Sequence, residues 1–179
     1  MNARWVIMTA FAILVATVST LGTISSPTAR SEKKAQETSA TTLQCTVQSV
    51  QDGDSLRVRC PGNSDSQRVR LHQIDAPELD QAYGNESRAK LTALCPKDAK
   101  VTIRAHGRDQ YGRILGEALC SGQSANRHMV ETGYAWAYDA HLLDDQLRTL
   151  QEKAKSARLG LWRDTRPTPP WQWRSNQSR

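Results

Sequence analysis

The chain has 179 residues, with 24 Lys and Arg against 18 Asp and Glu and a formal net charge of +6. This length suits one domain with a single hydrophobic core and excludes an array of large domains. The excess of positive charge suits a protein that meets polyanions, although many solvated surfaces are this basic. We find no internal repeat.

The N-terminus has the pattern of an export signal. Residues 1–29 contain one charged side chain, Arg4, followed by an apolar stretch from Trp5 to Ile24. This stretch is long for a cleaved signal and close to the ~20 residues that span a bilayer, so a retained membrane anchor stays open. We expect a signal peptide or signal anchor at 1–29 and a flexible linker at 30–42. The domain would then be periplasmic or extracellular, or tethered to the inner membrane.

The four cysteines support an exported location. Cys45, Cys60, Cys95 and Cys120 are an even number behind a signal segment, which indicates two disulfides with three connectivities allowed. Neither a C-x-x-C motif nor paired Cys and His spacing occurs in the sequence. A zinc site is therefore disfavoured.

The first β pattern is a hairpin around Asp52-Gly53. Apolar alternation at 43–50 and 55–60 flanks this dipeptide, which is the strongest local hairpin signal. A two-residue turn there places Cys45 opposite Cys60, which leaves Cys95 and Cys120 as the second pair. Asp54 leaves the turn with its carboxylate at the mouth of the hairpin.

The segment from Val69 to Glu78 gathers charged side chains near the end of a strand. We predict a strand at 68–75, and Pro77 must end it because proline has no N–H for the ladder. Arg70 and Asp75 are five residues apart and would point to opposite faces of a straight strand. If they share a site, the chain must bend or bulge between them.

The remaining elements follow in order. We predict a helix at 86–94 capped by Asn85, a strand at 101–105, a turn containing Gly112 and a strand from Arg113. A helix should start at Ser124 or Asn126 and end at Gly133. The clearest apolar face belongs to a helix at 142–158, with Gly160 as its stop.

The tail at 164–179 is too rich in proline for us to expect regular structure. Its Trp171, Trp173 and Arg174 could stack on single-stranded nucleic acid, but we expect the tail to dock onto the domain. Five short strands, with a helix between the third and the fourth, predict an α+β, mainly β fold. This is a five-stranded OB-fold barrel with about three helices.

Three phrases in this order resemble the staphylococcal nuclease, or thermonuclease, family. They are QDGDSLRV (51–58), RLHQIDAPE (70–78) and DQYGR (109–113). NRHMVETGYAWAY (126–138) and GLW (160–162) are similar to later segments of that family. The resemblance runs from about Leu43 to Trp162 and implies a nuclease domain at 43–163 with the same barrel.

The resemblance also implies a calcium-dependent phosphodiesterase that acts on DNA and RNA. The calcium ligands would be Asp54, Asp75 and the backbone carbonyl of Ala76. The catalytic set would be Arg70, Glu78 and Arg113, and the nucleotide site would include Tyr111 and Tyr138. The chain departs from the family where threonine usually stands at Ala76 and lysine at Gln110, and its segment after Glu78 is short.

These residue types suit the hydrolysis of a phosphodiester. Two carboxylates and a carbonyl give hard oxygen ligands that leave room for water and a phosphate oxygen. Two guanidiniums match the equatorial oxygens of the phosphate, and Glu78 remains to orient or deprotonate water. Because water attacks, both DNA and RNA could be cut, and the resemblance implies 3′-phosphate products. We expect a monomer without a protein partner.

The rival hypothesis is a non-catalytic OB-fold module that binds nucleic acid. It predicts the loss of at least one of the charged residues Arg70, Asp75, Glu78 and Arg113, yet the sequence retains all four. We expect no catalytic role for the scattered His72, His106, His128 and His141. Trp136 and Trp162 should pack in the core.

Overall fold

The computed structural model describes residues 41–138 and 144–178, which belong to the compact unit formed by residues 37–179. The predicted export segment, nearly all of the predicted linker and His141 lie outside the described residues. Across the two described ranges, no helix is long and apolar enough to cross a membrane.

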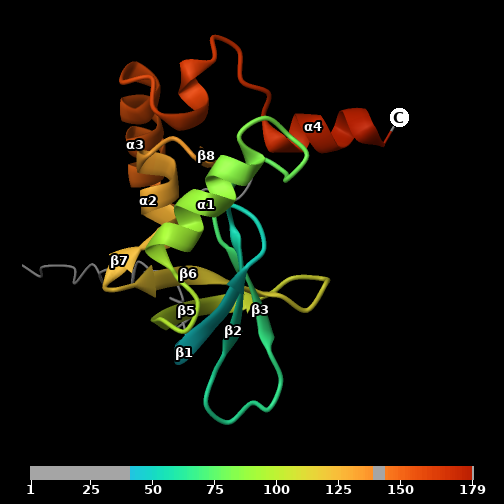
Figure 1. Ribbon diagram of the computed structural model, residues 1–179, viewed down its shortest axis with the longest axis vertical. Coiled ribbons are helices and arrows are strands. Elements are labelled where there is room, and N and C mark those ends of the chain that lie inside the picture. The colour runs from blue at the N-terminus through green and yellow to red at the C-terminus, as the bar shows by residue number, and fades with distance from the viewer. Residues whose placement is uncertain (1–40, 139–143, 179) are drawn as a thin grey trace, which may run out of the picture. The chain divides into compact units, whose positions relative to one another are not determined.

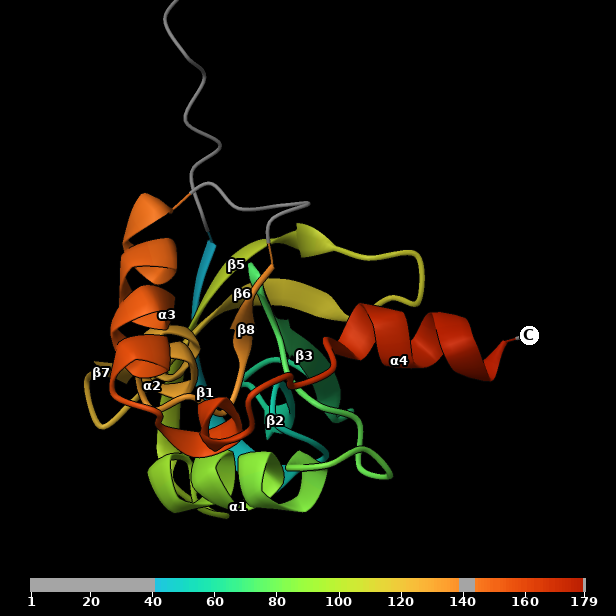
Figure 2. The same ribbon diagram turned by 90° about the horizontal axis from the view of Figure 1, so that it is seen from above.

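A closed β-barrel forms the body of this unit (Figures 1 and 2). Its strands lie in the order β3 (Gln67–Leu71), β2 (Ser55–Arg59), β1 (Thr41–Val50), β5 (Lys100–Arg108) and β6 (Ile114–Cys120). Parallel pairing between β3 and β6, with Val69 opposite Ile114, closes the ring. The five-stranded OB-fold prediction is confirmed.

Alternation of side chains explains why these segments form barrel strands. Along β6 every second residue is buried, from Ile114 to Cys120, as expected when one face of a strand lines a core. The interior is filled by the largest buried apolar side chains, which include Leu56, Leu71, Ile103, Val47, Val58 and Val69. The first strand begins at Thr41, two residues before the predicted domain boundary, because Thr41 and Thr42 pair with β5.

Four α-helices accompany the barrel within the described residues. They are α1 (Gly84–Leu94), α2 (Ala125–Glu131), α3 (Asp145–Ser156) and α4 (Pro170–Gln177), with a 3₁₀ helix, η2, at Gly160–Arg163. In both views α1 and α2 lie at one end of the barrel, and α3 packs beside α2 (Figures 1 and 2).

Two of the four described α-helices, α2 and α3, begin at a side-chain cap. The Ser124 hydroxyl accepts a hydrogen bond from the Arg127 amide at the start of α2, as one of our alternatives predicted. Asp144 does the same for α3, so this helix begins after residue 142. The prediction that Asn85 caps α1 is wrong, because α1 already includes Asn85 and its N-cap is Tyr83 in a left-handed conformation.

The predicted strand at 68–75 is interrupted by a turn. After β3 the chain turns at His72 and Gln73, and Gln73 has a φ of 64°. It then forms β4 (Ile74–Asp75), which pairs with β8 (Trp136–Ala137) in a separate two-stranded sheet. This turn supplies the bend required for Arg70 and Asp75 to share a site.

The hairpin keeps its predicted register but not its predicted turn. Val47 pairs with Val58, whereas a bulge before Ser49 shifts the remaining pairs and leaves a four-residue loop at 51–54. Gly53 is therefore required for close packing rather than for a two-residue turn. A Cβ at that position would lie 2.6 Å from the Cβ of Ala76 and 2.7 Å from that of Ser87.

The C-terminal tail contradicts the expectation of irregular structure, because residues 170–177 form α4. Pro170 occupies the first helical position, where a fixed φ favours the helix and no amide hydrogen is needed. Proline therefore starts this helix instead of preventing it. A short strand, β7 (Gln123–Ser124), extends the main sheet beside β6.

Two disulfides cross-link the barrel, Cys45–Cys60 and Cys95–Cys120, which is the pairing that the hairpin register predicts. The first joins β1 to the end of β2, and the second joins the end of α1 to β6. Together they account for all cysteines. Such cross-links are typical of proteins that fold in an oxidising compartment.

We expect the double substitution Cys95→Ala/Cys120→Ala to lower the free energy of unfolding by roughly 3 kcal/mol. The reason is that the disulfide restricts the conformations of the unfolded chain and so lowers its entropy. The closed loop spans 25 residues. Urea denaturation of the variant and the wild type measures the difference. An unchanged midpoint and slope would contradict a stabilising role for this disulfide.

Candidate active site

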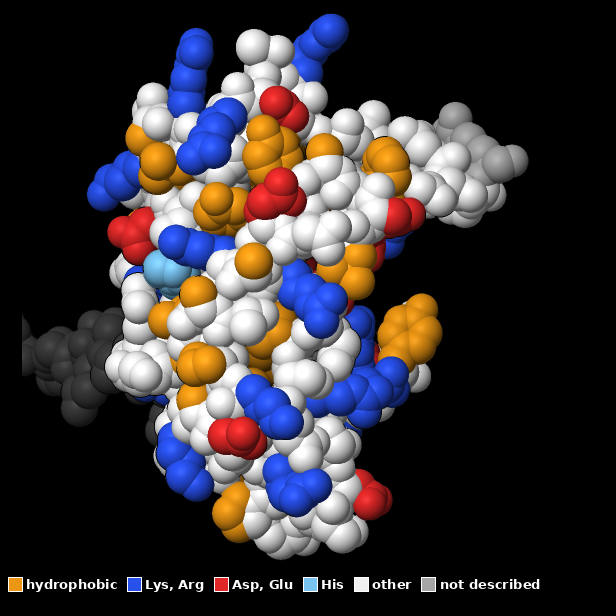
Figure 3. Space-filling view, in the orientation of Figure 1, with side chains coloured by type: hydrophobic (Ala, Val, Ile, Leu, Met, Phe, Trp, Pro, Cys, Tyr) orange, Lys and Arg blue, Asp and Glu red, His pale blue; other side chains and the backbone are white. Residues whose placement is uncertain are grey.

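One cavity, with a volume of about 310 Å³, contains every predicted metal ligand and catalytic residue. Its lining comes from the 51–54 loop, β2, β3, β4 and the residues after it, the β5–β6 loop and α4. In Figure 3 the surface is hollowed between α4 and the β5–β6 loop, and Lys and Arg side chains gather below the hollow. The cavity is lined by Asp52, Asp54, Ser55, Arg70, Asp75, Ala76, Glu78, Tyr111, Arg113 and Arg174.

The guanidinium of Arg70 lies at the centre of this cavity. Its Nη1 donates to the carbonyl oxygens of Leu71 and Ile74, at 2.7 and 2.9 Å. Its Nη2 is 2.9 Å from Oδ1 of Asp75, and its Nε is 3.2 Å from Oδ1 of Asp54. One side chain thus holds the turn after β3 and both predicted carboxylate ligands.

Asp54 is a buried carboxyl group, only 5% exposed. The amide of Ala76 donates to its Oδ2 at 2.6 Å and the hydroxyl of Ser55 to its Oδ1 at 3.2 Å. Burial raises the pKa of Asp54 to about 7, while the charge of Arg70 acts in the opposite direction. Burial thus disfavours the charged form of this carboxyl group, and Arg70 is the cation that partly offsets the effect.

Asp75 and Glu78 lie on either side of Pro77 and differ in exposure. The Asp75 side chain is 2% exposed, whereas that of Glu78 is 38% exposed. Arg174 bridges them: its Nη2 is 2.8 Å from Oδ2 of Asp75, and its Nη1 is 2.7 Å from Oε1 of Glu78. Hydrogen bonding to Asp75 raises the pKa of Arg174 above its ordinary value.

Arg113 reaches the cavity from the β5–β6 loop and is held by Asp109. The Asp109 carboxylate accepts the amides of Tyr111 and Arg113 at 2.9 Å each, and it accepts Nε of Arg113 at 2.7 Å. Burial acts to raise the pKa of Asp109, but these hydrogen bonds outweigh it and leave the pKa below its usual value. The guanidinium of Arg113 is thus oriented by a fixed, ionised carboxylate.

A second cavity, of about 410 Å³, adjoins the first and shares Arg70, Tyr111 and Arg113 with it. Tyr138 also lines this second cavity, so both tyrosines expected at the nucleotide site line the same cavity. Tyr111 is 63% exposed and its ring lies 5.7 Å from the Arg113 guanidinium. An aromatic surface beside two guanidiniums suits a nucleotide.

The donor chemistry of the first cavity fits a hard cation. Asp54, Asp75 and Ala76 offer oxygen atoms only, which calcium prefers over nitrogen or sulfur. In the described parts of the chain, no three His, Cys, Asp or Glu side chains are grouped to hold a metal. The expected set needs only two carboxylates, with a carbonyl and water for the rest.

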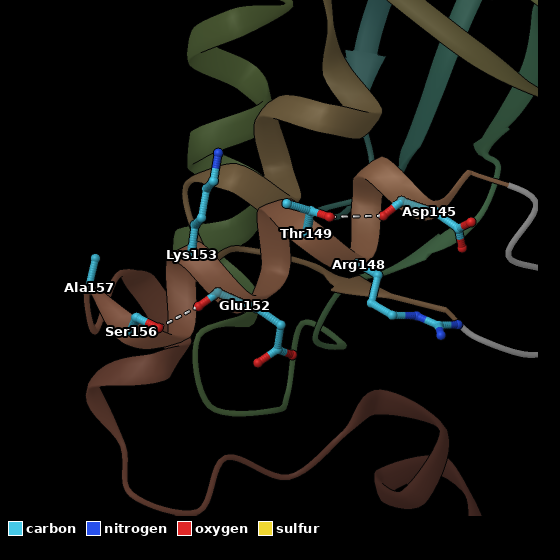
Figure 4. Close-up of a pocket in the computed structure, with 7 residues that line it drawn as sticks. All are labelled: Asp145, Arg148, Thr149, Glu152, Lys153, Ser156 and Ala157. Carbon is cyan, nitrogen blue, oxygen red and sulfur yellow. Dashed lines mark hydrogen bonds between the residues drawn. The ribbon is translucent and has the colours of Figure 1, made fainter.

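Another hollow, of about 860 Å³, has a different character. Its lining residues lie on α3 and its C-cap, Ala157, so it is the outer face of a single helix (Figure 4). Thr149 and Ser156 there donate to carbonyl oxygens of the same helix. We assign no site to it.

Three residues of the site escaped the sequence analysis. Arg174 belongs to the tail, which we expected to dock but not to enter the cleft. Asp109 stands in the DQYGR phrase without an assigned role. Asn126 fastens the turn after β3, because its side chain donates to the carbonyl of His72 and accepts the amide of Ala118. For Asp109 and Asn126, the only signal in the sequence was that both lie in segments that resemble the nuclease family.

The closed five-stranded barrel with a cleft lined by carboxylates and guanidiniums is an OB-fold domain of the thermonuclease class. A sequence model of the family described as "Staphylococcal nuclease homologue" matches residues 68–164. The chain therefore belongs to the staphylococcal nuclease homologue family.

Relatives of known name agree with this family. An "Uncharacterized endonuclease" of Escherichia coli is 40% identical over 126 residues, which are 70% of this chain and 80% of that protein. A protein of the same name from Haemophilus influenzae is 38% identical over 133 residues, 74% of each chain. The "Staphylococcal-like nuclease CAN1" of Arabidopsis thaliana is 35% identical over 111 residues, 62% of this chain but 34% of that protein.

The two arginines of the site should differ in their effect on stability. We expect Arg70→Ala to lower the free energy of unfolding by roughly 3 kcal/mol, because it removes the ion-pair partner of the buried Asp54 and one of the two partners of Asp75. Arg113→Ala should cost about 1 kcal/mol or less, because its ion pair with Asp109 is partly exposed. Urea denaturation without metal compares the two variants. Equal losses would contradict the central role of Arg70.

Proposed function

We propose that this protein is an exported, calcium-dependent nuclease that hydrolyses phosphodiester bonds of DNA and RNA. The observation that carries the proposal is the single cavity that gathers two buried carboxylates, a half-exposed carboxylate and two guanidiniums. Phosphodiester hydrolysis needs these groups, because the phosphate must be neutralised and water must be delivered to it. Membership of the family and the names of its relatives support a nuclease.

Asp54, Asp75 and the backbone carbonyl of Ala76 would hold the calcium ion. When bound there, the ion would polarise a phosphate oxygen and lower the pKa of a nearby water. Asp54 and Asp75 are buried and both pair with Arg70, so one side chain fixes the positions of the two carboxylates in the same cavity. The support for this calcium site is the position of these residues in one cavity and the oxygen atoms that they offer.

Glu78 is the carboxylate available for water. It is more exposed than the two proposed ligands, so solvent can reach its carboxylate. We propose that it orients or deprotonates the attacking water. Because the nucleophile is water, the substrate needs no 2′-hydroxyl, which is why both DNA and RNA would be cleaved.

Arg70 and Arg113 would bind the scissile phosphate from two sides. A guanidinium offers parallel N–H donors that match two phosphate oxygens. Arg70 contacts four acceptors, which leaves one of its five N–H groups for a phosphate oxygen. Arg113 makes its described side-chain hydrogen bond through Nε, so its terminal nitrogens would supply the fork to the phosphate. Tyr111 and Tyr138 would line the nucleotide beside the phosphate. The 3′-phosphate products follow from the family resemblance.

The location and organisation follow from the sequence. We propose that residues 1–29 direct export or anchor the chain, that 30–42 connect it, and that 43–163 form the nuclease domain with a tail at 164–179. Two disulfides support an oxidising location outside the cytoplasm. All groups of the cleft come from one chain, so we propose a monomer that acts without a protein partner.

We expect Arg113→Ala to lower turnover by on the order of 10³, by analogy with arginines that stabilise phosphoryl transition states. Glu78→Gln should lower turnover by about 10²–10⁴ while calcium affinity stays nearly constant. Turnover on single-stranded DNA at saturating calcium measures both. The control is Arg104→Ala, an exposed arginine that pairs with Glu117 away from the cleft. Equal cutting by all variants, or cutting that a chelator does not stop, would contradict the active-site assignment, and no cutting by the wild type would favour the non-catalytic binding module.

Asp54→Asn and Asp75→Asn should each weaken calcium binding by at least ~10-fold, because one of two anionic ligands is lost. Magnesium should support less activity than calcium, since it demands stricter octahedral geometry. Calorimetric titration measures the affinity. Asp52→Asn is the matched control, because Asp52 lines the same cavity but accepts from the amide of Asp54. An equal effect of Asp52→Asn would contradict the ligand assignment.

A further inference from the structure

The C-terminal helix enters the proposed active site through one side chain. Both oxygens of Asp75 accept from Arg174: Oδ1 from Nη1 at 3.2 Å and Oδ2 from Nη2 at 2.8 Å. The Oδ1 atom also accepts from Arg70. Because the Asp75 side chain is only 2% exposed, this fork covers the edge of the carboxylate that faces the cavity. The same guanidinium holds Glu78 at 2.7 Å.

We infer that Arg174 is a built-in competitor for the metal, so that calcium binds Asp75 only when α4 releases the carboxylate. The inference rests on the proposed calcium site. A bidentate guanidinium supplies to Asp75 the positive charge that a cation would supply, along the open edge where a cation would approach. Arg174 thereby determines how much calcium the site requires.

The charge balance of the cavity favours exchange over joint binding. When all groups are ionised, four carboxylates face three guanidiniums, a net charge of −1; without Arg174 the balance is −2, which one calcium ion neutralises. A divalent ion added while Arg174 stays in place would meet a guanidinium bound to the same carboxylate. Repulsion between two cations a few ångströms apart is large where little water screens it.

The helix that carries Arg174 is attached so that it can leave. Pro170 is its only buried residue, and Trp171 is 37% exposed where it packs against Trp136 and Tyr138. Beside it, Gln81 donates to the carbonyl of Thr168 at 2.6 Å and fastens the segment before α4. In Figure 1, α4 projects to the side of the barrel and ends at the C-terminus. Release of this helix would therefore expose one buried residue, Pro170, and the partly buried faces of Trp171 and Trp173.

Release of Arg174 also changes the nucleotide cleft. Trp171 lies 5.5 Å from the ring of Tyr138, which lines the adjoining cavity. The departure of α4 frees this tyrosine face at the same time as it frees Asp75. Calcium binding and access to the cleft are then coupled through one helix.

Calcium titration of the full-length chain by calorimetry tests the competition. Arg174→Ala should bind calcium on the order of 10-fold more tightly than the wild type, because the competent form no longer has to be created first. Arg174→Lys keeps the charge and loses the fork, so its affinity should lie between the two. Arg163→Ala removes an exposed arginine from the same C-terminal segment and should bind like the wild type.

Hydrogen exchange provides the second measurement. In the wild type, saturating calcium should speed amide exchange in residues 170–177; in Arg174→Ala, exchange there should already be fast and calcium should change it little. Equal calcium affinity of Arg174→Ala and wild type, or a helix as protected with calcium as without it, would overturn the competition while the nuclease proposal stands. If Arg174→Lys bound calcium with the wild-type affinity, the positive charge alone would account for the effect. That result would overturn the competition by the bidentate guanidinium. Failure of every variant to bind calcium would overturn the metal site, and the competition with it.

Discussion

A single guanidinium organises the cleft. Arg70 reaches two backbone carbonyls of the turn after β3 and two buried carboxylates from different segments. Removing any of these acceptors would leave donors of a mostly buried side chain unpaired. Removing Arg70 would leave Asp54 without its ion pair and Asp75 with Arg174 alone. Arg70 therefore fixes the positions of three segments relative to one another: the turn after β3, the 51–54 loop and the end of β4. These positions determine the shape of the cleft.

The barrel holds the charged groups in this arrangement, because its strands and loops are hydrogen-bonded and packed around them. The amide of Leu71 donates to the carbonyl of Asp54, which joins the hairpin loop to β3. Gly53 brings that loop against Ala76 and α1 with no room for a side chain. Two carboxylates are thereby held in one cavity, although burial and, to a smaller extent, repulsion act against the charged form of Asp54 and raise its pKa.

The C-terminal helix α4 supplies a positive charge to these carboxylates, and under our inference this charge controls calcium binding. Repulsion among clustered carboxylates is unfavourable when no metal is bound. Arg174 reduces this repulsion by pairing with Asp75 and Glu78. The relief comes from a helix with a single buried residue, so it is reversible. The same packing that places Arg174 also places Trp171 on Tyr138, so the nucleotide cleft and the metal ligands would respond together.

The sequence by itself determined the strands, the Cys45–Cys60 register and the identity of the charged groups, because alternation and hairpin pairing are local or nearly local. It also indicated that Arg70 and Asp75 could meet only if the chain bent. Only the tertiary structure decided how the bend is made, since a left-handed Gln73 has no signature in the pattern. It alone placed Arg174 on Asp75, 99 residues away in the chain. Contacts of that separation depend on how packed elements face one another, which no local pattern encodes.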